Sequence, residues 1–506
     1  MTKVLSIDLG TGGVRAGVYD IERKKMLSLS EASYETRYPK PGWAEQDVEQ
    51  WWRSLLRAGS QAVAEAGTGE IAAVCVATTA SSVVICDREG VPLRPAILWM
   101  DARATKESRD TVRIDHPVMA YSGGEDASEW LVPKAMWLAA NERPIYDRAA
   151  VICEALDFVN YRLTGEWAAS RMNATCKWNY DSLNGRFVPD IYAALGVPEL
   201  ADKLPRRVVP VGETVAALRP DVAAALGITS QSIVAQGGID AHIGVLGAGT
   251  VAPGGMLLIG GTSNVHLTHL AEQGDVSGFW GPYPNALVDG LWLVEAGQVS
   301  TGSILNWLSH TIFGLDTAGH AALIAEAAGR IAERSGLLTL DYWMGNRTPY
   351  RDANLRGAIL GLSLGHDRAD MYASAVDSIS LGSANVVEVL EQRGVEIHRI
   401  VVAGGICKNR LWLQSTVDAL GRPVQVAHED NLSLVGTAVC SASALGLFPN
   451  LIAASDACTA PTRGLEPDIS RTGWYAEAMS SYREATQALR PLFHTLAAQQ
   501  TSGAGR

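Results

Sequence analysis

The sequence has 506 residues, of which 47% are hydrophobic and 19% are charged, and its formal net charge is −12. A chain of this length and composition has enough apolar material for two or three globular domains. So acidic a chain lacks the positive surface that nucleic acids or anionic membranes require, although backbone N–H groups can still bind phosphate locally. We therefore expect neither nucleic acid nor a membrane among its partners.

Seven cysteines are scattered along the chain, and none forms a C-x-x-C pair. This usage indicates reduced thiols that are buried as small apolar side chains. The first ten residues do not have the charge and apolar run of a signal peptide, and no apolar run reaches the roughly 18 residues of a membrane span. These features predict a cytoplasmic protein.

The first half of the chain alternates between strands and helices. Residues 3–9 form an apolar run, a glycine-rich turn follows, and residues 14–19 complete a predicted hairpin. Residues 47–67 have helical spacing, with apolar side chains on one face. Further strands are predicted at 71–77 and 83–86, and further helices at 133–141 and 157–163. The alternation favours an α/β architecture.

The second half opens with a similar pattern. Apolar residues 256–259 lead into a Gly-Gly-Thr-Ser turn, and residues 264–268 read as the returning strand. A repeat at this distance predicts a duplicated domain, joined through the Gly/Pro-rich stretch 247–255. We expect domains at 1–250 and 251–450, followed at 451–506 by a C-terminal helix and a disordered tail over 501–506.

Two glycine-rich turns have the chemistry of phosphate binding. In the first, Gly12 allows backbone N–H groups to approach an anion closely, and Thr11 adds a hydroxyl donor. Asp8, at the end of the preceding strand, could hold a magnesium ion through water. Gly261 and Thr262 repeat this chemistry in the second turn. Each turn alone could be an ordinary hairpin, but two together suggest a nucleotide clamp.

Asp240 follows the apolar strand 233–235 and two glycines. In α/β sheets, ligands bind at such strand ends, and a carboxylate there can accept the proton of an attacking hydroxyl. The alternative is a plain helix N-cap.

Another apolar strand, 400–403, leads into Gly404 and Gly405. This turn suits a flat purine lying on the backbone, with Asn409 available for a hydrogen bond, or it is simply a tight turn before a helix.

Several known motifs are missing from the sequence. It contains no G-x-x-x-x-G-K-[ST], no G-x-G-x-x-G after a strand and no H-E-x-x-H. One G-x-S-x-G is centred on Ser363, and it would suit a hydrolase nucleophile elbow with His398 or His428 and Asp430 as partners.

The chain resembles the FGGY carbohydrate kinases, a family that includes glycerol kinase, xylulokinase and ribulokinase. The resemblance runs from Val4 to about Phe448. Its most specific part spans residues 357–377 and matches the second family signature at every position: Gly357-x-Ile359-x-Gly361-Leu362, seven residues, then Asp370-Met371-x-x-Ser374-Ala375-Val376-Asp377. This match accounts for the elbow-like pattern around Ser363. Further matching pieces lie at 42–47, 99–103, 133–138 and 347–352.

The resemblance implies two ribonuclease-H-like domains around a deep cleft, as in actin and hexokinase. It implies that ATP and Mg²⁺ are the cofactors, that Asp240 is the catalytic base and that Asp8 organises the metal. Nucleotide or phosphate contacts would come from Thr11, Gly12, Gly261, Thr262, Gly302, Asn306, Gly404, Gly405 and Asn409. The sugar would contact Ser81, Trp99, Glu129 and Asp240.

Departures from the family pattern bear on the substrate. Leu131 breaks the first family signature, and residues 78–82 read Thr-Thr-Ala-Ser-Ser in place of the segments typical of xylulokinases and glycerol kinases. By contrast, Cys176-Lys177-Trp178 resembles the ribulokinase type. The expected reaction is ATP-dependent phosphorylation of a ketopentose to its 5-phosphate. A polyol kinase for glycerol or erythritol and a non-catalytic sugar sensor stay open, as does a homodimer.

Overall fold

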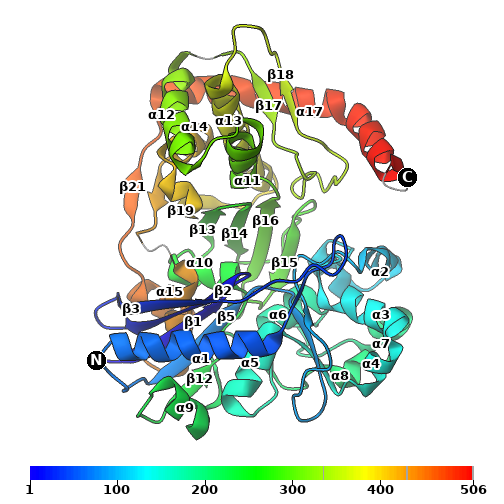
Figure 1. The fold of residues 1–506 in the computed structure, drawn as a ribbon, viewed down its shortest axis with the longest axis vertical. Helices are drawn as coiled ribbons and strands as arrows, with labels where there is room; N and C mark the ends of the chain where they lie inside the picture. The colour runs from blue at the N-terminus through cyan, green and yellow to red at the C-terminus, as the bar shows by residue number, and fades with distance from the viewer. Residues whose placement is uncertain (334, 429–430, 504–506) are drawn as a thin grey trace.

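The computed structural model describes residues 1–333, 335–428 and 431–503. Two mixed sheets form the centres of two lobes, stacked one above the other in Figure 1. The predicted α/β class is thus confirmed.

The sheet of the first lobe has six strands in the order β11-β12-β5-β1-β2-β3. Its strands are β1 (Lys3–Leu9), β2 (Gly13–Asp20), β3 (Lys25–Ser33), β5 (Ala73–Thr78), β11 (Thr214–Ala217) and β12 (Ile233–Ala235). A four-stranded sheet beside it contains β4 (Glu45–Gln46), β7 (Ala96–Ile97), β6 (Val83–Cys86) and β8 (Val151–Glu154), and a third pairs β9 (Ala169–Ser170) with β10 (Val208–Val209).

Helices of the first half surround these sheets. They are α1 (Val48–Glu65), α2 (Thr105–Asp110), α3 (Leu131–Asn141), α4 (Arg143–Arg148), α5 (Ala155–Thr164), α6 (Arg171–Lys177), α7 (Pro189–Ala194), α8 (Leu200–Lys203), α9 (Pro220–Leu226) and α10 (Asp240–Gly247). Short 3-10 turns span Thr111–Arg113 and Pro117–Ser122. The start of α1 follows from its sequence, because the Asp47 side chain accepts a hydrogen bond from the N–H of Glu49 and caps the helix.

The second lobe is built on a seven-stranded sheet with the order β15-β16-β14-β13-β19-β20-β21. These strands are β13 (Gly254–Gly260), β14 (Asn264–Leu270), β15 (Trp280–Pro284), β16 (Trp292–Gln298), β19 (Ile397–Gly404), β20 (Val424–Val426) and β21 (Arg463–Leu465), and β17 (Leu338–Leu340) pairs with β18 (Ala358–Leu360) separately. The helices are α11 (Gly302–Asn306), α12 (Thr317–Glu333), α13 (Arg368–Gln392), α14 (Arg410–Leu420), α15 (Leu432–Ala444), α16 (Leu451–Cys458) and α17 (Ile469–Gly503), with a π-helix at Trp307–Ile312 and a 3-10 turn at Gly405–Lys408.

The two main sheets repeat one arrangement. In the first, β1 pairs antiparallel with β2 and parallel with β5. In the second, β13 pairs antiparallel with β14 and parallel with β19. The repeated glycine-rich hairpins of the sequence are therefore equivalent parts of two similar lobes, and each turn lies at the end of its central strand.

Helices α10 and α15 pack tightly against each other between the lobes. A Cβ added to Gly436 would lie 2.1 Å from the carbonyl oxygen of Ile243, and one added to Gly247 would lie 2.1 Å from that of Leu432. Only glycine permits this approach. Helix α15 also packs on β1 and β5, so the chain returns to the first lobe after completing the second sheet. The domain boundaries at residues 250 and 450 stay predictions. Helix α15 lies before residue 450, within the second predicted domain, and yet it packs on strands of the first lobe.

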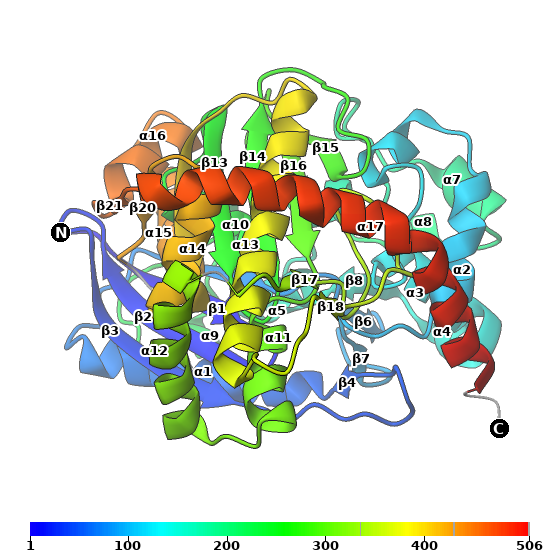
Figure 2. The ribbon, with the colours of Figure 1, turned by 90° about the horizontal axis from the view of Figure 1, so that it is seen from above.

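The long helix α17 crosses the second lobe on its outer side, over α13 and α14 (Figure 2). It extends through Gly503, so half of the tail expected to be disordered is helical. Adding a residue to an existing helix gains a hydrogen bond without a new nucleus, which favours this extension. Residues 504–506 lie outside the described part. Within the described ranges, no helix combines the length and apolar character needed to cross a membrane.

Candidate active site

Two carboxylates meet where the central strands of the first lobe end. Asp8 lies near the end of β1, and Asp240 is the first residue of α10 after β12. Both line a cavity of about 490 Å³ together with the first glycine-rich turn. Gly237 makes this approach possible, because a Cβ there would lie 1.9 Å from the carbonyl oxygen of Val76.

The two carboxylates raise each other's proton affinity. Burial and then the charge of Asp8 raise the pKa of Asp240 to about 7, against a hydrogen bond from the N–H of Ala241. Burial also raises the pKa of Asp8, although Ser433 donates a hydrogen bond to its Oδ2 at 2.8 Å and Arg15 lies nearby. A carboxyl with a pKa near neutrality, facing a cavity, has the properties of a general base.

The first glycine-rich turn is open to the cavity and is fixed from behind. A Cβ placed on Gly12 would meet no described atom within 4 Å. The side-chain amide of Gln46 donates to the carbonyl oxygen of Thr11 at 2.7 Å, and the indole of Trp99 donates to the Thr11 hydroxyl at 3.0 Å. The turn can therefore admit an anion while its own backbone is held in place.

The residues expected to contact nucleotide lie together in the second lobe. The N–H of Gly302 donates to the carbonyl oxygen of Gly261 at 3.0 Å, and a Cβ on Gly302 would lie 2.5 Å from that oxygen. Gly404 pairs in register with Gly260, which brings Gly405 within van der Waals reach of the Gly261 backbone. Thr262 is exposed at the tip of its turn.

The two asparagines differ in their surroundings. Asn306 is exposed at the end of α11. The Asn409 side chain caps α14 by accepting from the N–H of Trp412, and its amide donates to the hydroxyl of Tyr372 at 3.3 Å. Asn409 thus has a structural role, and the second donor of its amide has no partner among the described residues.

A smaller cavity of about 180 Å³ joins the two lobes. Asp8, Arg15 and Asp240 line it from the first lobe, and Ile259, Ala403 and Gly404 line it from the second. Gly404, one of the residues expected to hold nucleotide, therefore lines the same cavity as Asp8 and Asp240.

The surroundings of Asp8 fit a hydrated magnesium ion. Its Oδ1 is buried and has no hydrogen-bond partner among the described residues. Mg²⁺ usually keeps several waters and binds through one or two carboxylates plus substrate phosphates. In the described part of the chain, no three His, Cys, Asp or Glu side chains gather around a common point.

Ser81, which was predicted to contact the sugar, lies in a buried polar cluster. It is fully buried, and its hydroxyl donates to Oε1 of Glu154. Glu154 also accepts from the indole of Trp178 at 2.7 Å and the amide of Asn173 at 2.8 Å. The Ser81 hydroxyl is therefore occupied by the protein, because a short side chain next to a buried carboxylate pairs with it before any ligand arrives.

Glu129 lies at the junction of the lobes, where Arg347 of the second lobe approaches its Oε1 at 3.5 Å. The guanidinium of Arg347 also stacks 4.8 Å from the ring of Trp280.

Two charged residues near Asp240 were not predicted as site residues. Lys177, at the end of α6, lies with its Nζ 3.3 Å from Oε2 of Glu295 on β16, and its ammonium faces the ring of Trp130 at 4.7 Å. Glu295 is close enough to contribute to the raised pKa of Asp240. The Cys176-Lys177-Trp178 motif was a signal for Lys177, whereas Glu295 lies within an ordinary strand pattern.

The hydrolase alternative finds no support around Ser363. This residue is exposed, and its hydroxyl lies 3.2 Å from Nδ1 of His366, whose Nε2 contacts the carbonyl oxygen of Ser335. His398 is paired with Glu396 instead, and Asp430 lies outside the described residues. In a catalytic triad the histidine would be oriented by a carboxylate.

Comparisons with known proteins agree with this arrangement. Residues 3–247 match the N-terminal domain and residues 256–445 the C-terminal domain of the FGGY family of carbohydrate kinases. A human FGGY carbohydrate kinase domain-containing protein is 30% identical over 501 residues, covering 88% of this chain and 89% of its own length. A ribulokinase from Shouchella clausii is 29% identical, covering 87% of this chain and 86% of its own.

Solved structures also share the fold. The crystal structure of xylulose kinase from Rhodospirillum rubrum superposes with a TM-score of 0.85 at 26% identity, and the match covers 97% of this chain and 100% of the other. The two family domains together account for most of the sequence and for both lobes of the structure. The chain belongs to the FGGY family of carbohydrate kinases.

Proposed function

We propose that this protein transfers the γ-phosphoryl group of ATP to the terminal hydroxyl of a ketopentose, giving a pentulose 5-phosphate and ADP. The observation that carries the proposal is the placement of Asp240, with its pKa raised to about 7, on the cavity that the phosphate-type turn also lines. Relatives named ribulokinase over most of the chain, and a structural neighbour named xylulose kinase, support a pentulose as the acceptor.

Asp240 would accept the proton of the terminal sugar hydroxyl, and the oxygen of that hydroxyl would attack the γ-phosphorus of ATP. The bond to the bridging oxygen of the β-phosphate breaks, and ADP leaves with that oxygen. Magnesium, held through Asp8, would neutralise charge on the phosphates. The turns that contain Thr11 and Thr262 would supply N–H and hydroxyl donors from opposite lobes.

Lys177 and Glu295 would give the sugar its orientation. An ammonium donates to hydroxyl oxygens and a carboxylate accepts from hydroxyl protons, so the pair can satisfy adjacent hydroxyls of an open-chain sugar. The two side chains are only 6% and 13% exposed, which makes an unpaired polar group there costly. A ligand that lacks the matching hydroxyls is therefore disfavoured.

The test is a panel of acceptors at fixed ATP and magnesium, with ADP release as the signal. The acceptors are D-ribulose, L-ribulose, D-xylulose, L-xylulose, glycerol and erythritol. The proposal expects kcat/KM for the best pentulose to exceed that for both polyols by at least ~10-fold. A polyol as the best acceptor would make the protein a polyol kinase. Sugar binding without ADP release would indicate a non-catalytic sensor.

A further inference from the structure

The indole of Trp99 joins two parts of the site that were expected to serve different ligands. Its Nε1–H donates to the hydroxyl oxygen of Thr11 at 3.0 Å. Trp99 follows β7 and was predicted on the sugar side, whereas Thr11 belongs to the turn that lines the larger cavity. An aromatic side chain of one subsite thus contacts the hydroxyl of the other directly.

This hydrogen bond determines what the Thr11 hydroxyl can do. A threonine hydroxyl has one proton to donate and two lone pairs, whereas an indole nitrogen only donates. Accepting from Trp99 therefore occupies a lone pair of Thr11 and leaves its proton available. No hydrogen bond within the described part of the chain uses that proton. The group is set up as a donor for an acceptor in the cavity.

The backbone that carries Trp99 is rigidly held. The carbonyl oxygen of Leu98 accepts from Nζ of Lys134 at 2.6 Å, and the N–H of Leu98 donates to the carbonyl oxygen of Ala44 at 3.0 Å. Lys134 is fully buried and also donates to the carbonyl oxygen of Ser81 at 2.7 Å.

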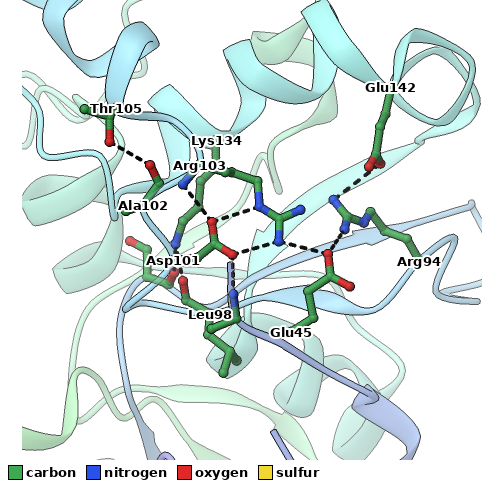
Figure 3. A network of polar contacts seen from close by, with 11 residues as sticks. Glu45, Arg94, Leu98, Asp101, Ala102, Arg103, Thr105, Lys134 and Glu142 are labelled. Carbon is green, nitrogen blue, oxygen red and sulfur yellow. Dashed lines mark hydrogen bonds and ion pairs between the residues drawn. The ribbon is translucent and has the colours of Figure 1, made fainter. Parts of the chain in front are cut away.

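On the other side of Trp99, the carboxylate of Asp101 holds the chain. Asp101 accepts from the N–H of Ala44 at 2.6 Å and binds the guanidinium of Arg103 through both oxygens, at 2.8 and 2.7 Å. Arg103 in turn contacts Glu45 at 2.9 Å. Figure 3 shows this network of buried charges around Leu98 and Asp101. The backbone on both sides of Trp99 is therefore held in place, and its indole donates to Thr11 from this fixed position.

We propose that Trp99 is a positioning residue for phosphoryl transfer, which holds the Thr11 hydroxyl so that its proton is donated to the γ-phosphoryl group of ATP. The proposal rests on the kinase function proposed above and adds a role for Trp99 on the nucleotide side. It follows that a sugar packed against the Trp99 ring would contact a residue that is itself hydrogen-bonded to Thr11 in the phosphate turn.

The kinetic test is a double-mutant cycle with W99F, T11V and W99F/T11V. Phenylalanine keeps an aromatic ring but loses the N–H, and valine keeps the shape of threonine but loses the hydroxyl. W99F alone should lower kcat by roughly 3- to 10-fold, the scale of one neutral hydrogen bond. In the T11V background the same change should alter kcat by less than about twofold, because no hydroxyl is left to position.

The matched control is W167F. The Trp167 indole stacks on Tyr161 in the first lobe, and its replacement should leave kcat unchanged. If the effects of W99F and T11V multiply, or if W99F raises only the KM for sugar, then Trp99 acts on the sugar alone and the proposal is wrong.

A binding measurement separates this proposal from the proposed function, because it needs no sugar. Calorimetry with Mg²⁺ and the ATP analogue AMP-PNP, compared with Mg²⁺ and ADP, isolates the γ-phosphoryl contact. W99F should weaken AMP-PNP binding roughly 3- to 10-fold when Thr11 is present, but not in the T11V background. It should leave the Kd of ADP unchanged. Equal weakening for both nucleotides, or for neither, would overturn the role of Trp99. Lack of turnover with every sugar would instead count against the kinase function.

Discussion

Lys177 and Glu295 form an ion pair across the two lobes, with Nζ 3.3 Å from Oε2. The same carboxylate oxygen lies 3.4 Å from Nε2 of His242, which follows Asp240 by two residues on α10. Burial opposes ionisation of Glu295, but Lys177, His242 and Arg347 outweigh it and hold the pKa of its carboxyl well below the usual range. A buried ion pair next to the proposed base is suited to binding sugar hydroxyls.

Replacing Lys177 by methionine should raise the KM for the sugar by at least ~10-fold, the scale of a lost hydrogen bond to a charged group. The KM for ATP should change by less than about twofold, because the residues expected to contact nucleotide, apart from the turn of Thr11 and Gly12, lie in the other lobe. Steady-state kinetics with each substrate varied in turn measures both values. Lys203→Met is the matched control, since Lys203 lies at the end of α8, away from the site, and donates to the carbonyl oxygen of Ala149. An unchanged sugar KM in Lys177→Met would remove this residue from the sugar subsite.

The pH dependence of the reaction should follow the Asp240 carboxyl. A base must be ionised to accept a proton, and the pKa of Asp240 is raised to about 7. The sugar kcat/KM should therefore rise about tenfold per pH unit below pH 7 and level off above it. A profile measured from pH 5 to 9 tests this behaviour. A rate that is flat down to pH 5 would show that the base titrates elsewhere.

A leucine at Gly405 should act on the nucleotide. The nearest described atoms to a Cβ at this position lie at 3.5 and 3.8 Å, so the substitution starts without a clash and extends into the region next to the Gly261 turn. The KM for ATP should rise by at least ~10-fold, equivalent to losing about 1.4 kcal/mol of binding, while the sugar KM changes less. Gly464→Leu on the edge strand β21, where a Cβ meets nothing within 4 Å of the described atoms, is the control. A larger rise in the sugar KM would contradict our assignment of this turn.

The stability of the protein should also reflect Asp240. Its pKa is raised above the usual 3.8 in the folded state, so the folded protein binds more protons than the unfolded chain between pH 4 and 7. The stability that this group contributes is therefore present at low pH and is lost as the pH rises towards 7. Asp240→Asn removes this pH-dependent contribution to stability. The Tm of the variant should therefore rise relative to the Tm of the wild type as the pH increases. Thermal melts at pH 5 and 8 would reveal it, and a constant difference in Tm would argue against a raised pKa.

Much of the fold could be predicted from local patterns. The hairpin β1–β2, helix α1 and the second hairpin β13–β14 lie within two residues of their predicted bounds, because apolar periodicity and turn glycines act over short distances. The repeat of the two hairpins indicated two similar lobes. The return of α15 to the first lobe had no such signal, since it depends on Gly247 and Gly436, which are far apart in the sequence.

The site could be predicted only where a motif carried it. Asp8, Thr11 and Asp240 lie at strand ends, and the structure brings all three to one cavity. The hydrogen bond of Ser81 could not be predicted, because its partner, Glu154, is 73 residues away and nothing in the sequence pairs them. Glu295 was missed for the same reason, since its importance comes from Lys177 and His242 on other elements.

The central claim is that Asp240 is the base of a sugar kinase, and the most direct measurement is the single-turnover rate of phosphoryl transfer from ATP to the best pentulose by Asp240→Asn. Asparagine keeps the size of the side chain but cannot accept the proton. The account predicts a rate at least ~10²-fold below that of the wild type, the scale of a lost general base, with the Kd of ATP unchanged within about twofold. A rate within about threefold of the wild type would contradict it.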